Sequence, residues 1–287
     1  MKIVVLLKQT FDTEEKITVT SGGVDEREAK FVINPYDEYA LEEAIRLRDK
    51  HGGEIVAVTC GPERSQEALR TALAIGADEA IRLDISEELQ GDSFAAASAL
   101  AAVIRPLAPH LLLAGLFAVD TGSGSVALQV AERLGLPHAS AAVKLTLLAA
   151  AELGDNGTTS PPAEGAAPDS RRLPNAEFYA LVERDAEGDT ETVVIPLPAL
   201  VTAQQGLNEP RYPSLPGIMK AKRKPLRTLS GDELGDSFNK DGSLSARTRQ
   251  TELFPPPPRA AGKRIAGTAE QQAAKLTELL QTEAKVL

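Results

Sequence analysis

The chain is poor in cysteine and in aromatic residues: its 287 residues include one cysteine, no tryptophan and 4% aromatic residues in all. One cysteine excludes an internal disulfide framework and predicts a reducing, cytoplasmic setting. The scarcity of aromatic rings disfavours a role that depends on stacking against bases. A net charge of −10 argues the same way, because an acidic chain is a poor partner for nucleic acid or for an anionic membrane surface.

Long apolar runs are also missing. None approaches the ~20 residues that a membrane-spanning helix requires, so we expect no direct insertion into a membrane. The N-terminal MKIVVLLKQT is too short and too soon charged to be a secretory signal. Any basic surface must therefore be local and serve some other partner.

Catalytic motifs are missing as well. His51, His110 and His138 are scattered without metal-ligand spacing, so we predict no metal site. Cys60 follows a buried strand and is interpreted as a small apolar filler. The sequence contains neither a nucleophile elbow nor the lysine motif of a phosphate loop. We therefore predict a protein that has no catalytic residues of its own.

Apolar strand-like runs alternate with helical patterns over residues 1–150. The run KIVVLL is short, β-branched and continuous, as expected of a strand buried on both faces. In the helix predicted at 35–51, Asn34 can cap the N-terminus, Pro35 suits the first turn and Gly52 can end the helix. The alternation predicts an α/β fold, a parallel sheet with helices on both faces. Strands are predicted at 2–7, 54–61, 80–83 and 110–116, and helices at 35–51, 63–76, 92–105 and 125–134.

The composition changes beyond residue 150. Residues 152–174 contain Gly, Pro, Ser and Thr but almost no large apolar residue, and are predicted to be a flexible insertion. Two strand-like segments, 176–184 and 191–203, should pair across a turn near Gly188. A polar excursion at 16–33 should form a hairpin. We divide the chain into an α/β domain (1–206), an arm (207–229), an extended tether (230–267) and a C-terminal helix (268–287).

The arm begins with LNEPRYPSLPGIMKAKRKPL, a stretch that does not suit a core. Its four prolines are expected to exclude helix and strand, and five Lys or Arg residues fall within 220–227. Leu215, Ile218 and Met219 lie among them without an evident periodic pattern. The stretch predicts an extended basic arm that carries a few apolar side chains.

One edge of the predicted sheet collects candidate binding loops. Gly122, Gly124 and Ala127 have the spacing of a dinucleotide fingerprint, but they do not follow the first strand and lack the acidic residue further on. The loop at 115–125 still joins a strand end to a helix start, where backbone N–H groups can hold a phosphate. Ligands of open α/β sheets bind at this edge, so we predict a nucleotide phosphate there, with an ordinary solvent loop as the alternative. Further strand ends at this edge are 6–9, 34–37 and 60–62.

Five segments, in order along nearly the whole chain, resemble the electron transfer flavoprotein β-subunit family: NPYDEYALEEAIRL, VTCGP, LRTALAIGADEAI, LPALVTA and LNEPRYPSLPGIMKAKRK. The resemblance implies a fold like that of the adenine-nucleotide α-hydrolases. It implies a heterodimer whose α-subunit holds most of an FAD, and an AMP bound structurally in this chain. It also implies electron uptake from acyl-CoA and related dehydrogenases, as in fatty acid oxidation, and delivery to the electron transfer flavoprotein-quinone oxidoreductase.

The resemblance also assigns residues. Asp185 takes the place of an acidic contact to an α-subunit arginine, with a merely solvated side chain as the alternative. Leu215 takes the place of a leucine that enters a pocket on the dehydrogenase, with packing inside the chain as the alternative. Tyr36 takes the place of an aromatic ring near the flavin. The basic residues expected to steer an acidic partner are Lys220, Lys222, Arg223 and Lys224. The implied AMP contacts are Leu6, Asn34, Pro35, Tyr36, Asp37, Cys60, Gly115, Leu116, Phe117, Ala118, Val119, Asp120, Thr121, Gly122 and Ser123.

The chain departs from the family in three places. The insertion at 152–174 is longer than the usual turn, the loop AVDTGSGSV lacks the common acidic and Gln-rich form, and Thr13 stands where some members have an aromatic residue. Two alternatives stay open. One is an electron-bifurcating relative with a second FAD in place of AMP. The other is a nucleotide-binding regulatory module without redox work.

Overall fold

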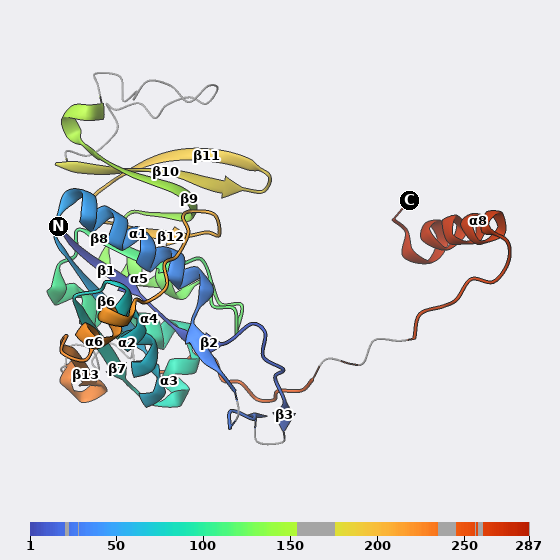
Figure 1. Cartoon of the computed structure of the whole chain (residues 1–287), viewed down its shortest axis with the longest axis horizontal. Helices are drawn as coiled ribbons and strands as arrows, with labels where there is room; N and C mark the ends of the chain where they lie inside the picture. The colour runs from blue at the N-terminus through green and yellow to red at the C-terminus, as the bar shows by residue number, and fades with distance from the viewer. Residues whose placement is uncertain are drawn as a thin grey trace.

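The computed structural model describes residues 1–20, 23–27, 29–153, 176–234, 245–255, 257 and 261–286. Within them, nine strands form one sheet in the order β11-β10-β9-β12-β8-β1-β6-β7-β13 (Figure 1). The strands β10 (Phe178–Ala186) and β11 (Asp189–Pro196) extend one edge as an antiparallel hairpin. The parallel strands are β1 (Lys2–Leu6), β6 (Glu54–Cys60), β7 (Glu79–Asp84), β8 (Leu111–Gly115), β9 (His138–Ala149), β12 (Ala199–Ala203) and β13 (Leu226–Ser230).

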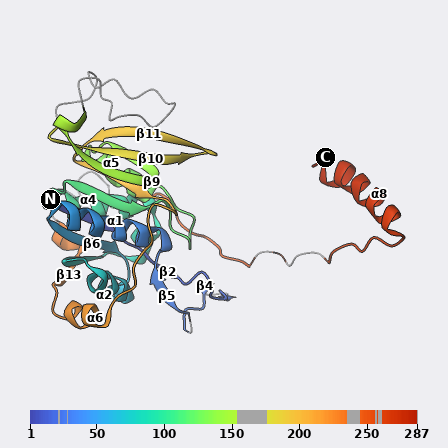
Figure 2. The ribbon, with the colours of Figure 1, turned by 45° about the horizontal axis from the view of Figure 1, so that its top comes forward.

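Helices cover both faces of this sheet (Figure 2). One core lies under α1, α2 and α6, and the other lies under α4 and α5. Strand β1 serves both, because successive residues of a strand point to opposite faces: Ile3 and Val5 join the first core, Val4 and Leu6 the second. The predicted α/β fold is confirmed, with a sheet that is mostly parallel. The helices are α1 (Pro35–His51), α2 (Gln66–Ile75), α3 (Glu87–Gly91), α4 (Ser93–Ile104), α5 (Val126–Leu134), α6 (Leu215–Ala221) and α8 (Ala269–Leu279).

Two predicted hairpins are present, and several strands were not predicted. Strands β3 (Val19–Thr20) and β4 (Gly23–Val24) pair, and β10 pairs with β11 across Gly188, whose φ of 101° suits glycine. The segment 191–203, however, does not form one strand: β11 ends at Pro196, and the second half of the segment returns to the sheet centre as β12. Strand β9 was missed because its Ala-rich sequence has weak strand propensity. Two short strands, β2 (Gln9–Phe11) and β5 (Phe31–Ile33), form a separate pair.

The arm is more ordered than its prolines predict. The expectation that they exclude helix and strand is wrong, because 215–221 form α6 and 226–230 form β13, which pairs with β7. Pro216 falls in the first turn of α6, where proline is tolerated, and the Ser214 hydroxyl caps the helix by accepting from the Gly217 N–H at 3.1 Å. Leu215, Ile218 and Met219 therefore have helical i, i+3, i+4 spacing. They stay exposed, Leu215 by 74%, so Leu215 does not pack inside the chain.

Polar contacts hold α6 against α2. The Arg70 guanidinium donates to the Ala221 carbonyl at 2.8 Å, and the Lys224 ammonium donates to the carbonyls of Leu73 and Ala77, near the end of α2. Burial lowers the pKa of Lys224. Lys224 thus has an internal role, which corrects its expected place among the steering residues. Lys220, Lys222 and Arg223 remain exposed.

The start of the arm is clamped on α1 by a partly buried ion pair. Arg211 Nε and Nη2 donate to the two carboxylate oxygens of Glu42 at 2.7 and 2.9 Å, and Arg46 donates to the same carboxylate. The Glu42 side chain is only 4% exposed. Burial opposes its charge, but the hydrogen bonds from Arg211 and Arg46 outweigh this and keep the pKa of Glu42 below its usual value.

We expect Arg211→Met to lower the free energy of unfolding by about 1–3 kcal/mol, because Glu42 would lose its bidentate partner while still buried. Urea unfolding of the full chain measures this change. Arg223→Met, on an exposed part of the same arm, is the matched control and should change stability by less than about 0.5 kcal/mol. Equal stabilities of the two variants would contradict a structural role for the clamp.

The C-terminal part is only partly as expected. The predicted C-terminal helix is present as α8, and it begins with a capping box in which the side chains of Thr268 and Gln271 accept from each other's backbone N–H groups. Both views show α8 apart from the sheet (Figures 1 and 2). Within the predicted tether at 230–267, the backbone N–H groups of Arg247 and Thr248 donate to Asp92. Residues 154–175, most of the predicted insertion, lie outside the described residues.

Of the helices that the structure describes, none has both the length and the apolar character needed to cross a bilayer.

Candidate nucleotide-binding site

A cavity of about 380 Å³ lies at the carboxyl ends of β1, β6 and β8, between the ends of α1, α4 and α5. The structure brings nine of the predicted site residues together in its lining. Six others lie beside it: Pro35, Tyr36, Leu116, Val119, Asp120 and Gly122. The lining includes Leu6, Asn34, Asp37, Cys60, Gly115, Phe117, Ala118, Thr121 and Ser123.

Sequence reasoning missed another part of this lining, which includes Lys8, Gln90, Gly91 and Ser93. Lys8 lies two residues beyond β1, within the strand-end segment already noted at 6–9. The others follow the end of β7, so the rule that ligands bind at strand ends applied to them too. Residues 90–93 were passed over because they precede an Ala-rich helix that has no glycine-rich loop.

Asp37 joins three elements at the floor of the cavity. It is the third residue of α1, 6% exposed, and its two oxygens accept from the Lys8 N–H at 2.6 Å and the Gly115 N–H at 2.9 Å. The ends of β1 and β8 are thereby fixed to the start of α1. Asn34 does similar work for the adjoining loop: its amide donates to the Phe117 carbonyl at 2.9 Å and accepts from the Val119 N–H at 3.1 Å. Asn34 is at the N-cap position of α1, as expected, but its side chain makes no capping hydrogen bond there.

Burial raises the pKa of Asp37 to about 7 from an ordinary 3.8, although its two N–H donors favour the charged form. Between about pH 4 and pH 7 the folded chain then holds a proton that the unfolded chain has lost. We expect the free energy of unfolding to fall as pH rises through this window, by up to ~1.4 kcal/mol per pH unit, and to level off above it. Urea unfolding of the full chain at several pH values measures the slope. Asp37→Asn, which cannot titrate, should lack this component; an identical slope in both proteins would contradict it.

The rim of the cavity carries groups that suit an anion. The Lys8 ammonium, half exposed, pairs with Asp120 at 2.7 Å, and Ser93 and Ser123 hydroxyls meet at 3.3 Å across the opening. The first residues of α5, Val126 and Ala127, also line the cavity, so the positive end of this helix faces it. A cation, hydroxyls and a helix N-terminus together form a donor set for a phosphate.

Cys60 lines the same cavity with a thiol that stays protonated near neutral pH. Burial raises the pKa of its thiol to about 12, and the nearby carboxylate of Asp84 adds to this. A neutral thiol is a poor nucleophile and a poor metal ligand. The interpretation of Cys60 as an apolar filler agrees with this geometry. Among the described residues, no three His, Cys, Asp or Glu side chains come close enough to hold a metal ion.

The remaining predicted residues lie elsewhere. The Tyr36 ring packs on Phe117 beside the cavity, with 4.3 Å between ring centroids. Asp185 is exposed near the end of β10, in the antiparallel hairpin. Leu215 is on α6, beyond α2. The cavity, the hairpin and α6 thus form three separate surfaces.

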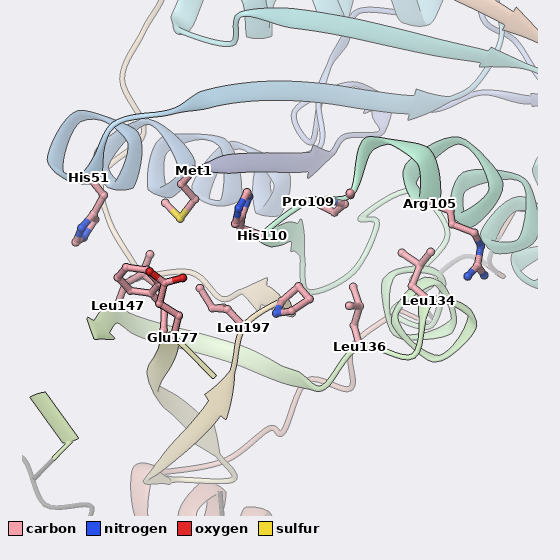
Figure 3. Close-up of a pocket in the computed structure, with 13 residues that line it drawn as sticks. Met1, His51, Arg105, Pro109, His110, Leu134, Leu136, Leu147, Glu177 and Leu197 are labelled. Carbon is pink, nitrogen blue, oxygen red and sulfur yellow. The ribbon is translucent and has the colours of Figure 1, made fainter. Parts of the chain in front are cut away.

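A larger groove of about 700 Å³ lies at the opposite ends of the parallel strands, where β1, β8 and β12 begin (Figure 3). It brings together His51 and His110, which are far apart in the sequence, with apolar side chains such as Leu136 and Leu197. His110 Nδ1 accepts from the Lys2 N–H at 3.0 Å, so this histidine helps to fix the start of β1. Ligands of open α/β sheets bind at the carboxyl edge, which makes the smaller cavity the candidate site.

The fold and the cavity define an α/β protein of the class that binds nucleotides at the carboxyl edge of a parallel sheet. Comparison with known proteins narrows this class to one family. Residues 21–167 match the family model described as electron transfer flavoprotein domain. The chain is 44% identical to the electron transfer flavoprotein subunit beta of Bacillus subtilis (strain 168), over all of both chains. It is 36% identical to that of Syntrophomonas wolfei, over 100% of this chain and 98% of the relative, and 34% identical to that of Mus musculus, over 97% and 98%.

The chain therefore belongs to the electron transfer flavoprotein β-subunit family, and the resemblance stated from its sequence is confirmed. Membership makes it an electron transfer flavoprotein subunit and indicates an electron carrier.

Proposed function

We propose that this chain is the β-subunit of a heterodimer in which an α-subunit holds most of an FAD and this chain binds one AMP. The observation that carries the proposal is the likeness to β-subunits over the full length together with a phosphate-suited cavity at the sheet edge. FAD supplies the redox chemistry of the complex when bound. The AMP has a structural role, and this chain contributes binding surfaces and no catalytic residue.

The electrons, in this proposal, come from acyl-CoA and related dehydrogenases and pass to the electron transfer flavoprotein-quinone oxidoreductase. Such a carrier needs brief contacts with more than one enzyme. The exposed apolar face of α6, with Lys220, Lys222 and Arg223 beside it, suits a transient contact better than a permanent one. The single cysteine, Cys60, fits the reducing cytoplasm in which we place the complex.

The residues of the cavity fit an adenine mononucleotide. Lys8, Ser123 and the N-terminus of α5 would hold the phosphate. The apolar side chains of Ala96 and Leu100 line the same cavity and suit the base. Its volume of about 380 Å³ is near the lower end of the roughly 300–1,000 Å³ typical of small-molecule sites, which favours AMP over a second, much larger FAD.

Nucleotide extraction from the chain co-expressed with its α-subunit tests the proposal. One FAD and one AMP per heterodimer is the expected result. Two FAD would support the electron-bifurcating alternative, and AMP or ATP without flavin would support the regulatory module. A colourless complex, purified gently, would overturn the electron-carrier function altogether.

A further inference from the structure

We propose that Asp92 is a positioning residue that couples the nucleotide cavity to the segment around Arg247 and Thr248, called here the C-terminal segment. Each of the two should stabilise the other. The proposal rests on the proposed function in one respect, that the cavity holds AMP. Asp92 lies between α3 and α4, and it is 1% exposed. Its two carboxylate oxygens bond to two different parts of the chain.

One oxygen organises the cavity side. Asp92 Oδ1 accepts from the Ala95 N–H at 2.8 Å and so caps α4. The neighbours of Asp92 on both sides, Gly91 and Ser93, line the cavity. Because Ser93 also meets Ser123 across the opening, the cap fixes one wall of the site.

The other oxygen holds the C-terminal segment. Asp92 Oδ2 accepts from the N–H groups of Arg247 and Thr248 at 3.0 and 2.8 Å, and from the Thr248 hydroxyl at 2.7 Å. The Arg247 guanidinium lies 3.2 Å from the centre of the Phe94 ring, and that of Arg133 from α5 lies 4.2 Å from it. The Phe94 ring of α4 therefore links the C-terminal segment with α4 and α5. The first turns of both helices line the cavity.

A shared carboxylate makes the two sides thermodynamically dependent. A nucleotide that orders residues 91–96 fixes Asp92 in the position that Arg247 and Thr248 require. In return, these residues hold the wall that the nucleotide contacts. Coupling of binding free energies is reciprocal, so loss of the C-terminal contact must weaken AMP binding by the same factor as AMP strengthens the contact.

The test uses the heterodimer, AMP as the probe, and the double variant Arg247→Ala/Thr248→Val, which removes the Thr248 hydroxyl bond to Asp92 and the Arg247–Phe94 contact and leaves every cavity-lining residue intact. We expect its dissociation constant for AMP, measured by calorimetry after the bound nucleotide has been removed, to rise about 3- to 10-fold. In the wild type, AMP should slow amide hydrogen exchange at Arg247 and Thr248. The double variant should exchange faster at 92–96 even without AMP.

The matched control is Arg249→Ala/Thr251→Val, the same substitutions at exposed positions a few residues further on. It should bind AMP like the wild type. If both variants bind AMP equally and AMP leaves exchange at Arg247 and Thr248 unchanged, the coupling is overturned while the AMP site stands. If even the wild type binds no AMP, both the coupling and the AMP assignment fail.

Discussion

Replacing Leu215 by alanine should slow reduction of the complex by its dehydrogenase roughly 10- to 100-fold, while the heterodimer stays assembled and loaded with flavin. Full burial of a leucine contributes about 1.5–3 kcal/mol, and each 1.4 kcal/mol corresponds to a factor of ten. Leu215 is 74% exposed at the first position of α6. Its removal therefore costs nothing inside the chain, and the whole effect should fall on docking.

The way α6 is held explains why one side chain can count for so much. Ser214 caps the helix, Gly217 sits close against the Ala74 carbonyl, and Arg70 bonds the Ala221 carbonyl. A side chain presented from a fixed helix loses little conformational entropy when it docks. Ile218 and Met219 extend the same apolar face.

Stopped-flow reduction of the flavin, under pseudo-first-order conditions and at two salt concentrations, measures the effect. Phe254→Ala is the matched control, because Phe254 is a large apolar side chain, 69% exposed, on a different part of the chain. It should leave the rate unchanged. An unchanged rate for Leu215→Ala would remove the docking role, and loss of flavin from that variant would point to a structural role instead.

Much of the fold could be predicted from local sequence patterns, but the structure of the arm depends on where each proline falls. The strand KIVVLL and the helix after Asn34 could be predicted because the pattern of apolar residues within each segment indicates which side chains are buried. In the arm, the number of prolines was misleading, since what matters is where each one falls, and Pro216 falls in the first turn of α6. The spacing of Leu215, Ile218 and Met219 was already helical and was the signal that should have been used.

The site shows the same division. Strand ends at 6–9, 34–37 and 60–62 and the loop at 115–125 were found from sheet geometry, and all contribute to one cavity. The partners of Asp37 could not be found this way, because they are backbone N–H groups that any residue carries. Asp92 was hidden for a different reason: its partners are 155 and 156 residues away along the chain, at Arg247 and Thr248.

Gly115→Ala should cost the chain both its bound AMP and about 2–4 kcal/mol of unfolding free energy. Gly115 ends β8 where α1 begins beside it, and its N–H donates to Asp37. A Cβ at this position would overlap Asp37 Oδ1 and lie 2.7 Å from two atoms of Tyr36, its carbonyl carbon and its Cβ. Part of this obstacle is backbone in the first turn of α1, so a rotamer change cannot relieve it.

The displaced helix would take Asp37 away from the N–H groups of Lys8 and Gly115, which fix the floor of the cavity. Urea unfolding and extraction of AMP from the purified heterodimer measure the two effects. Gly262→Ala is the control: a Cβ there meets no atom within 4 Å, and Gly262 does not line the cavity. If Gly115→Ala kept its AMP and its stability as Gly262→Ala should, the close approach of α1 to β8 would not be what holds the nucleotide site together.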